Sequence, residues 1–341
     1  MVHMILATAL LFSFPDKQKR VPYHMISFTI LYLFLALRYN YGNDYITYYN
    51  MHTAMNSGLG GWGSNDILFK GLNLLLPNFY LFIAIISLFY IVVIYLFMKY
   101  ANRGNSYLFS VLIWLINPYL FLVHLSTIRQ TIAICFFIIA TKYIVEKKCF
   151  KYYLSILIAM GFHKSAIILL PIYFIINDSK IKRKNTMIIY GILAILIATP
   201  ILDIIIYTVL EYFPAHYKVY FEQGLKNSFR ATVLSSFYFF IILLNINKLE
   251  YRDMIYAKLS LIATIISILC FKLSMLTRIG MYFDVFLIVT IPAVFKTIKT
   301  KLYRQILFLI MIGIYILRYT SFFINPIWHE AYSSYTTLFG R

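Results

Sequence analysis

The sequence predicts an all-α, polytopic membrane protein of about 11–12 transmembrane helices. Of its 341 residues, 62% are hydrophobic and only 13% are charged. A soluble domain is typically about 45–50% apolar and roughly 25% charged. Apolar runs near 20 residues long, the length that spans a bilayer as a helix, recur from one end of the chain to the other. We therefore expect a single integral membrane domain over residues 1–341.

The apolar runs give the expected helices in chain order. The first is short, and the others approach or exceed the length of one membrane crossing. They cover residues 2–14, 21–37, 79–98, 106–125, 130–146, 150–176, 186–207, 231–246, 254–272, 279–295 and 303–323.

The positive charge of the chain, a formal net +19, is concentrated in alternate connections between these runs. Most lysines and arginines lie in one set of connections, around residues 17–20, 99–103, 142–151, 180–184, 248–258 and 296–304. Basic residues mark cytoplasmic loops, so this set is assigned to the cytoplasm. The excess is then mainly an orientation signal, and nucleic acid is not expected as a partner.

Residues 150–176 require a different arrangement, because the basic clusters on both sides of them belong to the cytoplasm. Twenty-seven residues are too few for two full spans and too many for one upright helix, at about 1.5 Å per residue. We expect two short or tilted helices with His163 near the tip, and Glu146 and Lys184 on one side of the membrane.

Two long loops, residues 38–78 and 211–230, fall on the outer side, together with the unusual polar residues. Charged residues in lipid are costly and default to functional candidates. The candidates for substrate binding are Arg38, Tyr45, Arg129, Gln130, Arg278 and Tyr282, and the catalytic candidates are Asp44 and His163. Arginines match phosphate oxygens, a carboxylate or imidazole can accept a proton from a hydroxyl, and tyrosines suit sugar rings.

Other polar features are given structural interpretations. Asn65 or Asp66 is expected to begin a short interfacial helix, and Pro326–Tyr332 is expected to be a membrane-surface tail. No motif with metal-ligand spacing occurs in the sequence, so neither a metal nor a cofactor is expected.

In their order, these clusters resemble the EpsG/Wzy-type family of bacterial polysaccharide polymerases. The motifs of that family look like R-x-x-x-G-x-D-Y-x-x-Y after an early span, then S-x-x-x-R-Q, F-H-x-S-A and, late in the chain, R-x-x-x-Y. The corresponding residues are Arg38, Gly42, Asp44, Tyr45 and Tyr48; Ser126, Arg129 and Gln130; Phe162, His163, Ser165 and Ala166; and Arg278 and Tyr282. Members usually carry an acidic residue before an aromatic one in the first outer loop, and here Asp66 near Phe69 fills that place.

The resemblance implies a fold similar to the C-type glycosyltransferases and a glycosyltransferase of the bacterial inner membrane. The implied reaction joins undecaprenyl-diphosphate-linked oligosaccharide units on the outer face, in the assembly of O-antigen, capsule or exopolysaccharide. The implied partners are that substrate, membrane lipid and a chain-length regulator. Arg129 and Arg278 would hold the diphosphate, Arg38 would order Asp44 or join the same anion site, and Asp44 or His163 would assist the acceptor hydroxyl.

Three alternatives stay open. A flippase or transporter of lipid-linked oligosaccharide is favoured by Asp203 and Asp284, although the internal repeats typical of transporters are not visible. A membrane O-acyltransferase would use an intramembrane histidine and a cytoplasmic acyl donor. A ligase that attaches finished polymer to a lipid core would have a similar sequence.

Overall fold

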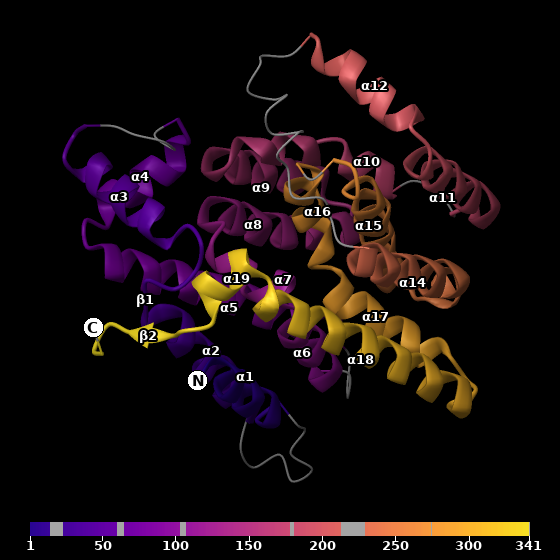
Figure 1. Ribbon diagram of the computed structural model, residues 1–341, viewed down its shortest axis with the longest axis horizontal. Coiled ribbons are helices and arrows are strands. Elements are labelled where there is room, and N and C mark those ends of the chain that lie inside the picture. Colours follow the sequence, from indigo (N-terminus) through magenta and orange to yellow (C-terminus); the bar gives the residue numbers. More distant parts are fainter. Residues whose placement is uncertain are drawn as a thin grey trace. The chain divides into compact units, whose positions relative to one another are not determined.

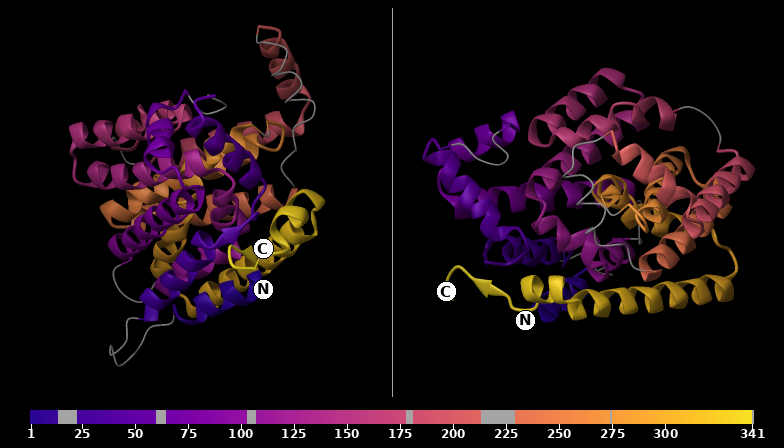
Figure 2. Two further views of the ribbon diagram at one scale, coloured as in Figure 1. Left: turned by 90° about the vertical axis from the view of Figure 1, so that its left-hand side faces the viewer. Right: turned by 45° about the horizontal axis from the view of Figure 1, so that its top comes forward.

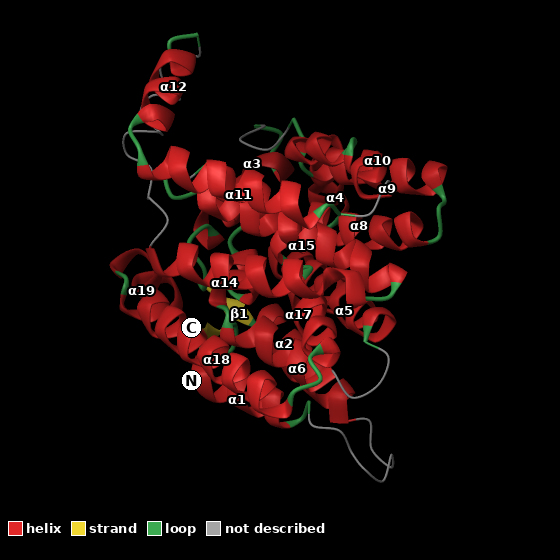
Figure 3. Cartoon of the chain, turned by 90° about the vertical axis from the view of Figure 1, so that its right-hand side faces the viewer, coloured by secondary structure: helices red, strands yellow, loops and turns green. Residues whose placement is uncertain are grey.

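The computed structural model describes residues 1–13, 23–59, 65–102, 107–177, 181–212, 229–273 and 275–340. Within these residues nearly all regular structure is helical, and the strand content is two short segments (Figure 3). The expected fold class, an all-α polytopic membrane protein, is confirmed. Most of the expected 211–230 loop, and the glycine-rich run at 60–64, lie outside the described residues.

The chain forms two compact units, Met1–Ile175 with Tyr315–Arg341, and Ile176–Ile314. Two helices, α10 (Ile172–Asn177) and α18 (Lys301–Ile324), contain the boundaries between them.

The first unit holds the N-terminal helices and the C-terminal segment, labelled in Figure 1. Its elements before α10 are α1 (Val2–Leu11), α2 (Tyr23–Ala36), β1 (Arg38–Tyr39), α3 (Tyr45–Asn56), α4 (Ile67–Leu75), α5 (Phe79–Ala101), α6 (Tyr107–Ile116), α7 (Pro118–Phe121), η1 (Val123–Leu125), α8 (Ile128–Val145), α9 (Cys149–Phe162) and η2 (Lys164–Leu169). After α18 it adds α19 (Pro326–Tyr332) and β2 (Thr336–Thr337).

The second unit contains the helices between α10 and α18. They are α11 (Arg183–Ala198), α12 (Ile201–Leu210), α14 (Phe229–Asn245), η3 (Ile246–Lys248), α15 (Tyr251–Leu269), α16 (Leu276–Asp284) and α17 (Leu287–Thr297). Within this unit α15 packs against α14, α16 and α17, so it is the central helix of the group.

The described helices include four that are long and apolar enough to cross a membrane, or up to seven if each bent pair is one span. Two of the four, α5 and α8, belong to the first unit, while α1, α2 and α9 are apolar but shorter. The expected apolar runs thus coincide with helices. Fewer of these helices than the expected 11–12 are long and apolar enough to cross a membrane. The difference arises because several runs are interrupted.

The interruptions have local causes in the sequence. The α6–α7 pair bends by 94° and the α11–α12 pair by 81°, and each bend lies beside a proline, Pro118 and Pro200. Proline cannot donate a backbone hydrogen bond and disfavours helical geometry in the residue before it. The third bent pair, α16 and α17, turns by 53°.

Helix α9 and the segment η2–α10 form the hairpin that the charge pattern predicts. The Tyr152 hydroxyl donates to the Leu169 carbonyl at 2.6 Å, and the Tyr153 hydroxyl donates to the Leu170 carbonyl at 3.2 Å. These cross-contacts place the turn near His163, which ends α9 and begins η2. Because α9 also packs along α8, seen in Figure 1, the hairpin is held against a membrane-length helix.

The C-terminal segment, which includes the expected membrane-surface tail Pro326–Tyr332, folds back onto the loop that follows α2. Strands β1 and β2 pair antiparallel, with Arg38 opposite Thr337, and the Leu338 amide donates to the Leu37 carbonyl at 3.0 Å. Tyr332 is fully buried. The right-hand view of Figure 2 shows this segment as the yellow end of the chain beyond α18.

Candidate active site

Arg38 is a buried cation at the C-terminal end of α2. Its Nη1 donates to the Leu35 carbonyl at 2.7 Å and to the Ser87 hydroxyl at 3.4 Å, so it caps carbonyl groups where the helix dipole favours positive charge. Burial lowers the pKa of Arg38 to about 10, an effect that nearby tyrosines, with Tyr45 first, oppose. It remains charged at neutral pH, and it forms no ion pair with any residue that the structure describes.

The residues after Arg38 form a tight turn whose shape depends on Gly42. Gly42 has φ +108°, a conformation that residues with a Cβ rarely adopt. Its amide donates to the Ala331 carbonyl and its carbonyl accepts from the Tyr45 amide, both at 3.1 Å. The Tyr45 hydroxyl donates back to the Arg38 carbonyl at 3.4 Å. This turn places Asp44 at the N-terminus of α3.

Tyr332, from the C-terminal segment, closes over this turn. Its hydroxyl lies 2.5 Å from the Ser126 hydroxyl, and its carbonyl accepts from the Tyr41 hydroxyl at 3.2 Å. Burial raises the pKa of Tyr332, the Ser126 hydrogen bond and the Arg38 charge lower it, and Asp44 raises it. The charges of Arg38 and Asp44 therefore both act on this one hydroxyl.

Arg129 lies at the second position of α8 and is held by an acidic partner. Its Nη1 is 2.6 Å from Oδ2 of Asp66, and both side chains are almost fully buried, at 11% and 5% exposed. Tyr48 shares this pair: burial raises the pKa of Tyr48, and hydrogen bonds to the Arg129 side chain and backbone lower it. Gln130, the next residue, is also buried.

His163 is half-buried at the turn between α9 and η2. It is connected to the Arg129 pair through α4: at Gly161, two residues before His163, a Cβ would come 2.5 Å from Cδ1 of Leu68. Leu68 is the second residue of α4, two positions after Asp66 at the N-cap position of that helix. The close approach of α4 and α9 thus fixes the cap residue Asp66 and the His163 turn in one unit.

The first unit brings together Arg38, Asp44, Tyr45, Arg129 and Gln130, and it contains His163. Arg278 and Tyr282 belong to the second unit, on α16. There Tyr282 is fully buried while Arg278 is exposed. Their four-residue spacing puts them on neighbouring positions of one helix face, with only Arg278 open to solvent or lipid.

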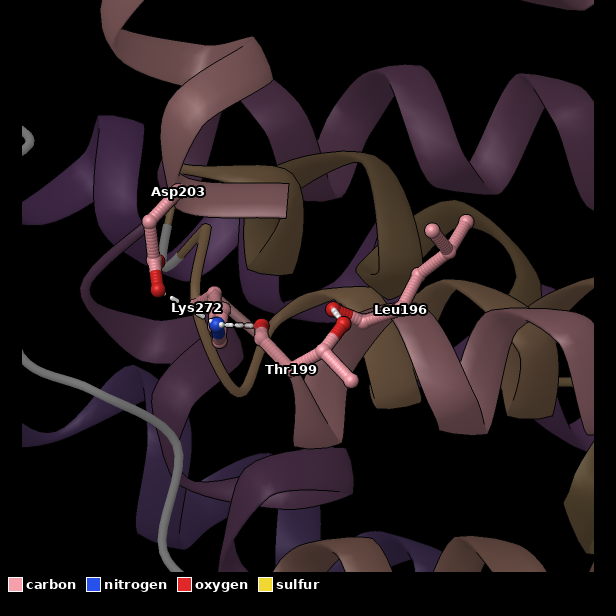
Figure 4. A network of polar contacts seen from close by, with 4 residues as sticks. All are labelled: Leu196, Thr199, Asp203 and Lys272. Atoms are coloured by element: carbon pink, nitrogen blue, oxygen red, sulfur yellow. Dashed lines mark hydrogen bonds and ion pairs between the residues drawn. The ribbon is translucent and has the colours of Figure 1, made fainter. Parts of the chain in front are cut away.

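Asp203, which favoured a transporter, forms an ion pair in the second unit. Lys272 Nζ lies 2.5 Å from Oδ2 of Asp203 and donates to the Thr199 carbonyl at 2.7 Å, while the Thr199 hydroxyl donates to the Leu196 carbonyl at 3.3 Å. Figure 4 shows these four residues around the α11–α12 break. Lys272 therefore neutralises Asp203 and satisfies a carbonyl beside Pro200, which is a structural role.

Metal-ligating residues do not gather in the described part of the chain, where no group of three histidine, cysteine or acidic residues could hold an ion. The donor set at the turn after α2 and around Arg129 is instead cationic and hydroxylic. Such a set suits an anion and a polyhydroxylated ligand.

Three residues of this arrangement were not among the sequence candidates: Asp66, Ser126 and Tyr332. Ser126 and Asp66 occupy motif positions, so their places in the family pattern were the available signal. Tyr332 carries no such signal, because it is 206 residues from Ser126 in the chain.

Comparison with known proteins gives one match. The model of the EpsG family matches residues 22–337. No curated protein matches, and no solved structure matches.

Proposed function

Because the chain belongs to the EpsG family, which supports a polysaccharide polymerase-type function, we propose that it joins undecaprenyl-diphosphate-linked oligosaccharide repeat units. The transfer takes place at the outer face of the cytoplasmic membrane. The charge pattern supports this orientation, because basic connections are typical of the cytoplasmic side. The polymer would be an O-antigen, a capsule or an exopolysaccharide.

The observation that carries this proposal is Arg129 and its surroundings. A buried arginine near the N-terminus of a membrane-length helix combines a bidentate donor with the positive end of the helix dipole. Asp66 holds the guanidinium at 2.6 Å and serves as a counter-ion that a diphosphate replaces. The Tyr48 hydroxyl adds a donor beside it.

In the proposed reaction, an acceptor hydroxyl oxygen attacks the anomeric carbon of the donor sugar. The anomeric carbon–oxygen bond breaks, and its electron pair leaves with undecaprenyl diphosphate. Arg129 and Arg278 stabilise the charge on that leaving group. The hydroxyl proton passes to Asp44 or His163. Since the leaving group is already activated, positioning and charge stabilisation provide most of the acceleration.

Arg38 and Tyr45 act here as positioning residues. Arg38 is only 4% exposed and is engaged with Leu35 and Ser87, so it shapes the turn that carries Asp44 and adds positive potential. Gln130 and Tyr282, both buried, support the arginines beside them in sequence or on the same helix.

The proposal is tested with purified full-length protein in liposomes supplied with lipid-linked repeat units. Arg129→Ala and Arg278→Ala are each expected to lower polymer formation at least about a hundredfold, the usual scale for loss of a group that stabilises developing charge. Arg304→Ala, on an exposed position of α18, is the matched control and should retain activity. Normal polymer from both Arg129→Ala and Arg278→Ala would exclude the diphosphate assignment.

The pH profile distinguishes the two proton acceptors. A carboxylate base gives an acid limb of the rate near about pH 4, and an imidazole base gives one near about pH 6.5. Asp44→Asn and His163→Gln should each be assayed across that range. The variant that abolishes the acid limb identifies the base.

Deletion of the gene separates this function from its rivals. A strain without a polymerase should carry glycolipid with a single repeat unit. A strain without a flippase should carry none on the outside, and a strain without a ligase should accumulate unattached polymer.

A further inference from the structure

Arg318 is a cation inside a membrane-length helix, and the site described above does not use it. It lies on α18, a 24-residue helix that is long and apolar enough to cross a membrane, six residues before the helix ends at Ile324. That distance corresponds to about 9 Å of helix, so Arg318 lies near the interfacial end of the span. A charged residue inside a span is costly unless it pairs, serves a function or reaches the interface with its side chain.

One aromatic ring faces the Arg318 guanidinium, and two further rings pack around that ring. Its central carbon lies 4.4 Å from the centroid of the Tyr119 ring. Tyr119 in turn contacts Phe322 edge-on at 5.3 Å and Trp328 at 5.9 Å, and these two rings stack at 5.1 Å. A ring face stabilises the guanidinium by about 0.5–2 kcal/mol, but it leaves the positive charge without a counter-ion.

The structure describes no protein counter-ion for this residue. None of the ion pairs among the described residues includes Arg318, and its Nε is buried with no hydrogen-bond partner among them. A guanidinium stacked on one ring keeps its edge donors available for a planar, bidentate contact with phosphate. The Arg318 charge is therefore not neutralised by any ion pair among the described residues.

We propose that Arg318, framed by Tyr119, Phe322 and Trp328, binds the phosphate groups of a second polyprenyl diphosphate, the one that carries the acceptor sugar. This inference rests on the proposed function. Glycosyl transfer between two lipid-linked units requires two diphosphates at once, and only the donor loses its diphosphate. Arg129 serves the donor, so the acceptor needs a separate anion site.

Contacts within the first unit connect the Arg318 site to the candidate active site. Trp328 lies 6.1 Å from the ring of Tyr332, and the Tyr332 hydroxyl meets Ser126, which precedes Arg129 by three residues. The two arginines are thus separated by several side chains on one continuous network.

The test measures the stoichiometry of farnesyl diphosphate binding to the full-length protein in detergent. The wild-type chain should bind two molecules, Arg318→Gln and Arg129→Ala one each, and the double variant none. Arg304→Gln, on the same helix, is the matched control and should bind two. Tyr119→Leu should weaken the Arg318-dependent site by about twofold to thirtyfold, the range that corresponds to losing the cation–π contact that positions the guanidinium. Gel filtration verifies the fold of each variant.

Three outcomes would overturn the inference. One is unchanged stoichiometry in Arg318→Gln. Another is displacement of farnesyl diphosphate from the Arg318-dependent site by an equal concentration of phosphatidylglycerol, which would make it a site for ordinary headgroups. The third is equal binding of inorganic pyrophosphate, which would exclude a contribution from the lipid. Because binding is measured without sugar, the result is independent of whether the protein polymerises repeat units.

Discussion

At the scale of single residues, Gly42 determines where the proposed active-site turn can lie. Its φ of +108° excludes most side chains, and a Cβ there would stand 3.0 Å from the Ser126 hydroxyl and 3.7 Å from the Tyr332 hydroxyl. Both the backbone conformation and the space around it therefore require glycine. The same contacts join the loop after α2, the segment before α8 and the C-terminal segment.

Gly42→Ala should accordingly lower both thermal stability and polymer formation. Gly58→Ala is the matched control, because Gly58 also has a positive φ, +75°, but no atom lies within 4 Å of its Cβ position. A left-handed conformation alone costs about 1–2 kcal/mol, so the excess loss in Gly42→Ala reflects the clash with Ser126 together with the less favourable φ of Gly42. Equal melting temperatures in detergent for the two variants would contradict this interpretation.

His52, on α3, gives stability a dependence on pH. Its Nε2 donates to the Leu76 carbonyl at 2.8 Å, which anchors α3 to the end of α4. Burial lowers the pKa of His52, and the hydrogen bond to Leu76 opposes that shift. The unfolded chain, with an ordinary histidine pKa near 6.5, therefore takes up a proton more readily than the folded chain. The stability is fully present above pH 6.5 and is lost as the pH falls toward the folded pKa.

The measurement compares melting temperatures of wild-type protein and His52→Gln between pH 7.5 and pH 5. Glutamine retains an N–H donor for Leu76 but does not titrate in this range. The wild type should lose more stability on acidification than the variant. Parallel curves for the two proteins would show that His52 does not contribute to the acid sensitivity.

At the scale of elements, α4 packs closely against α9. A displacement of α4 therefore also moves Asp66, the partner of Arg129. A Cβ at Gly161 would meet Cδ1 of Leu68 at 2.5 Å and its Cβ at 3.3 Å. The end of the Leu68 side chain can rotate, since it is 41% exposed, but its Cβ moves only with α4. Displacing α4 shifts Asp66, which directly precedes that helix.

Gly161→Ala is therefore expected to reduce polymer formation, and the addition of Leu68→Ala should restore most of it. Gly191→Ala, on α11, is the control, because nothing lies within 4 Å of its Cβ position. Alanine is favoured over glycine in a helix interior by up to about 1 kcal/mol, so the control should be neutral or more stable. Failure of Leu68→Ala to rescue Gly161→Ala would show that steric contact with α4 is not the cause.

At the scale of the whole molecule, the sequence predicted the positions of the helices better than it predicted their bends and the contacts between distant segments. Apolar runs depend only on neighbouring residues, so they marked α5, α8 and α18 closely. The bends were less visible, because Pro118 and Pro200 lie inside runs whose composition stays apolar. The length of the segment 150–176 predicted the α9–α10 hairpin only in combination with the basic clusters on both sides of it.

The candidate site was predictable where it is local and not where it depends on distant contacts. The motif residues Arg38, Asp44 and Arg129 could be chosen from their charge in apolar surroundings. The Arg129–Asp66 pair spans 63 residues and the Ser126–Tyr332 contact spans 206, and periodicity carries no information about such pairings. The sequence therefore did not predict that Tyr332, in the C-terminal segment, is buried against Ser126.

The hairpin also makes a prediction about the topology of the complete chain. If α9 and η2–α10 enter and leave the membrane on one face, the connections on both sides of them share a compartment. Alkaline phosphatase, active only outside the cytoplasm, fused after Glu146 or after Lys184 should be inactive at both positions, and green fluorescent protein at the same positions should fluoresce. A fusion at His163 should differ from both if the tip reaches the outer side. Opposite results at Glu146 and Lys184 would mean that the segment crosses once, which would place Arg278 on the cytoplasmic side, away from the outer-face chemistry proposed for it.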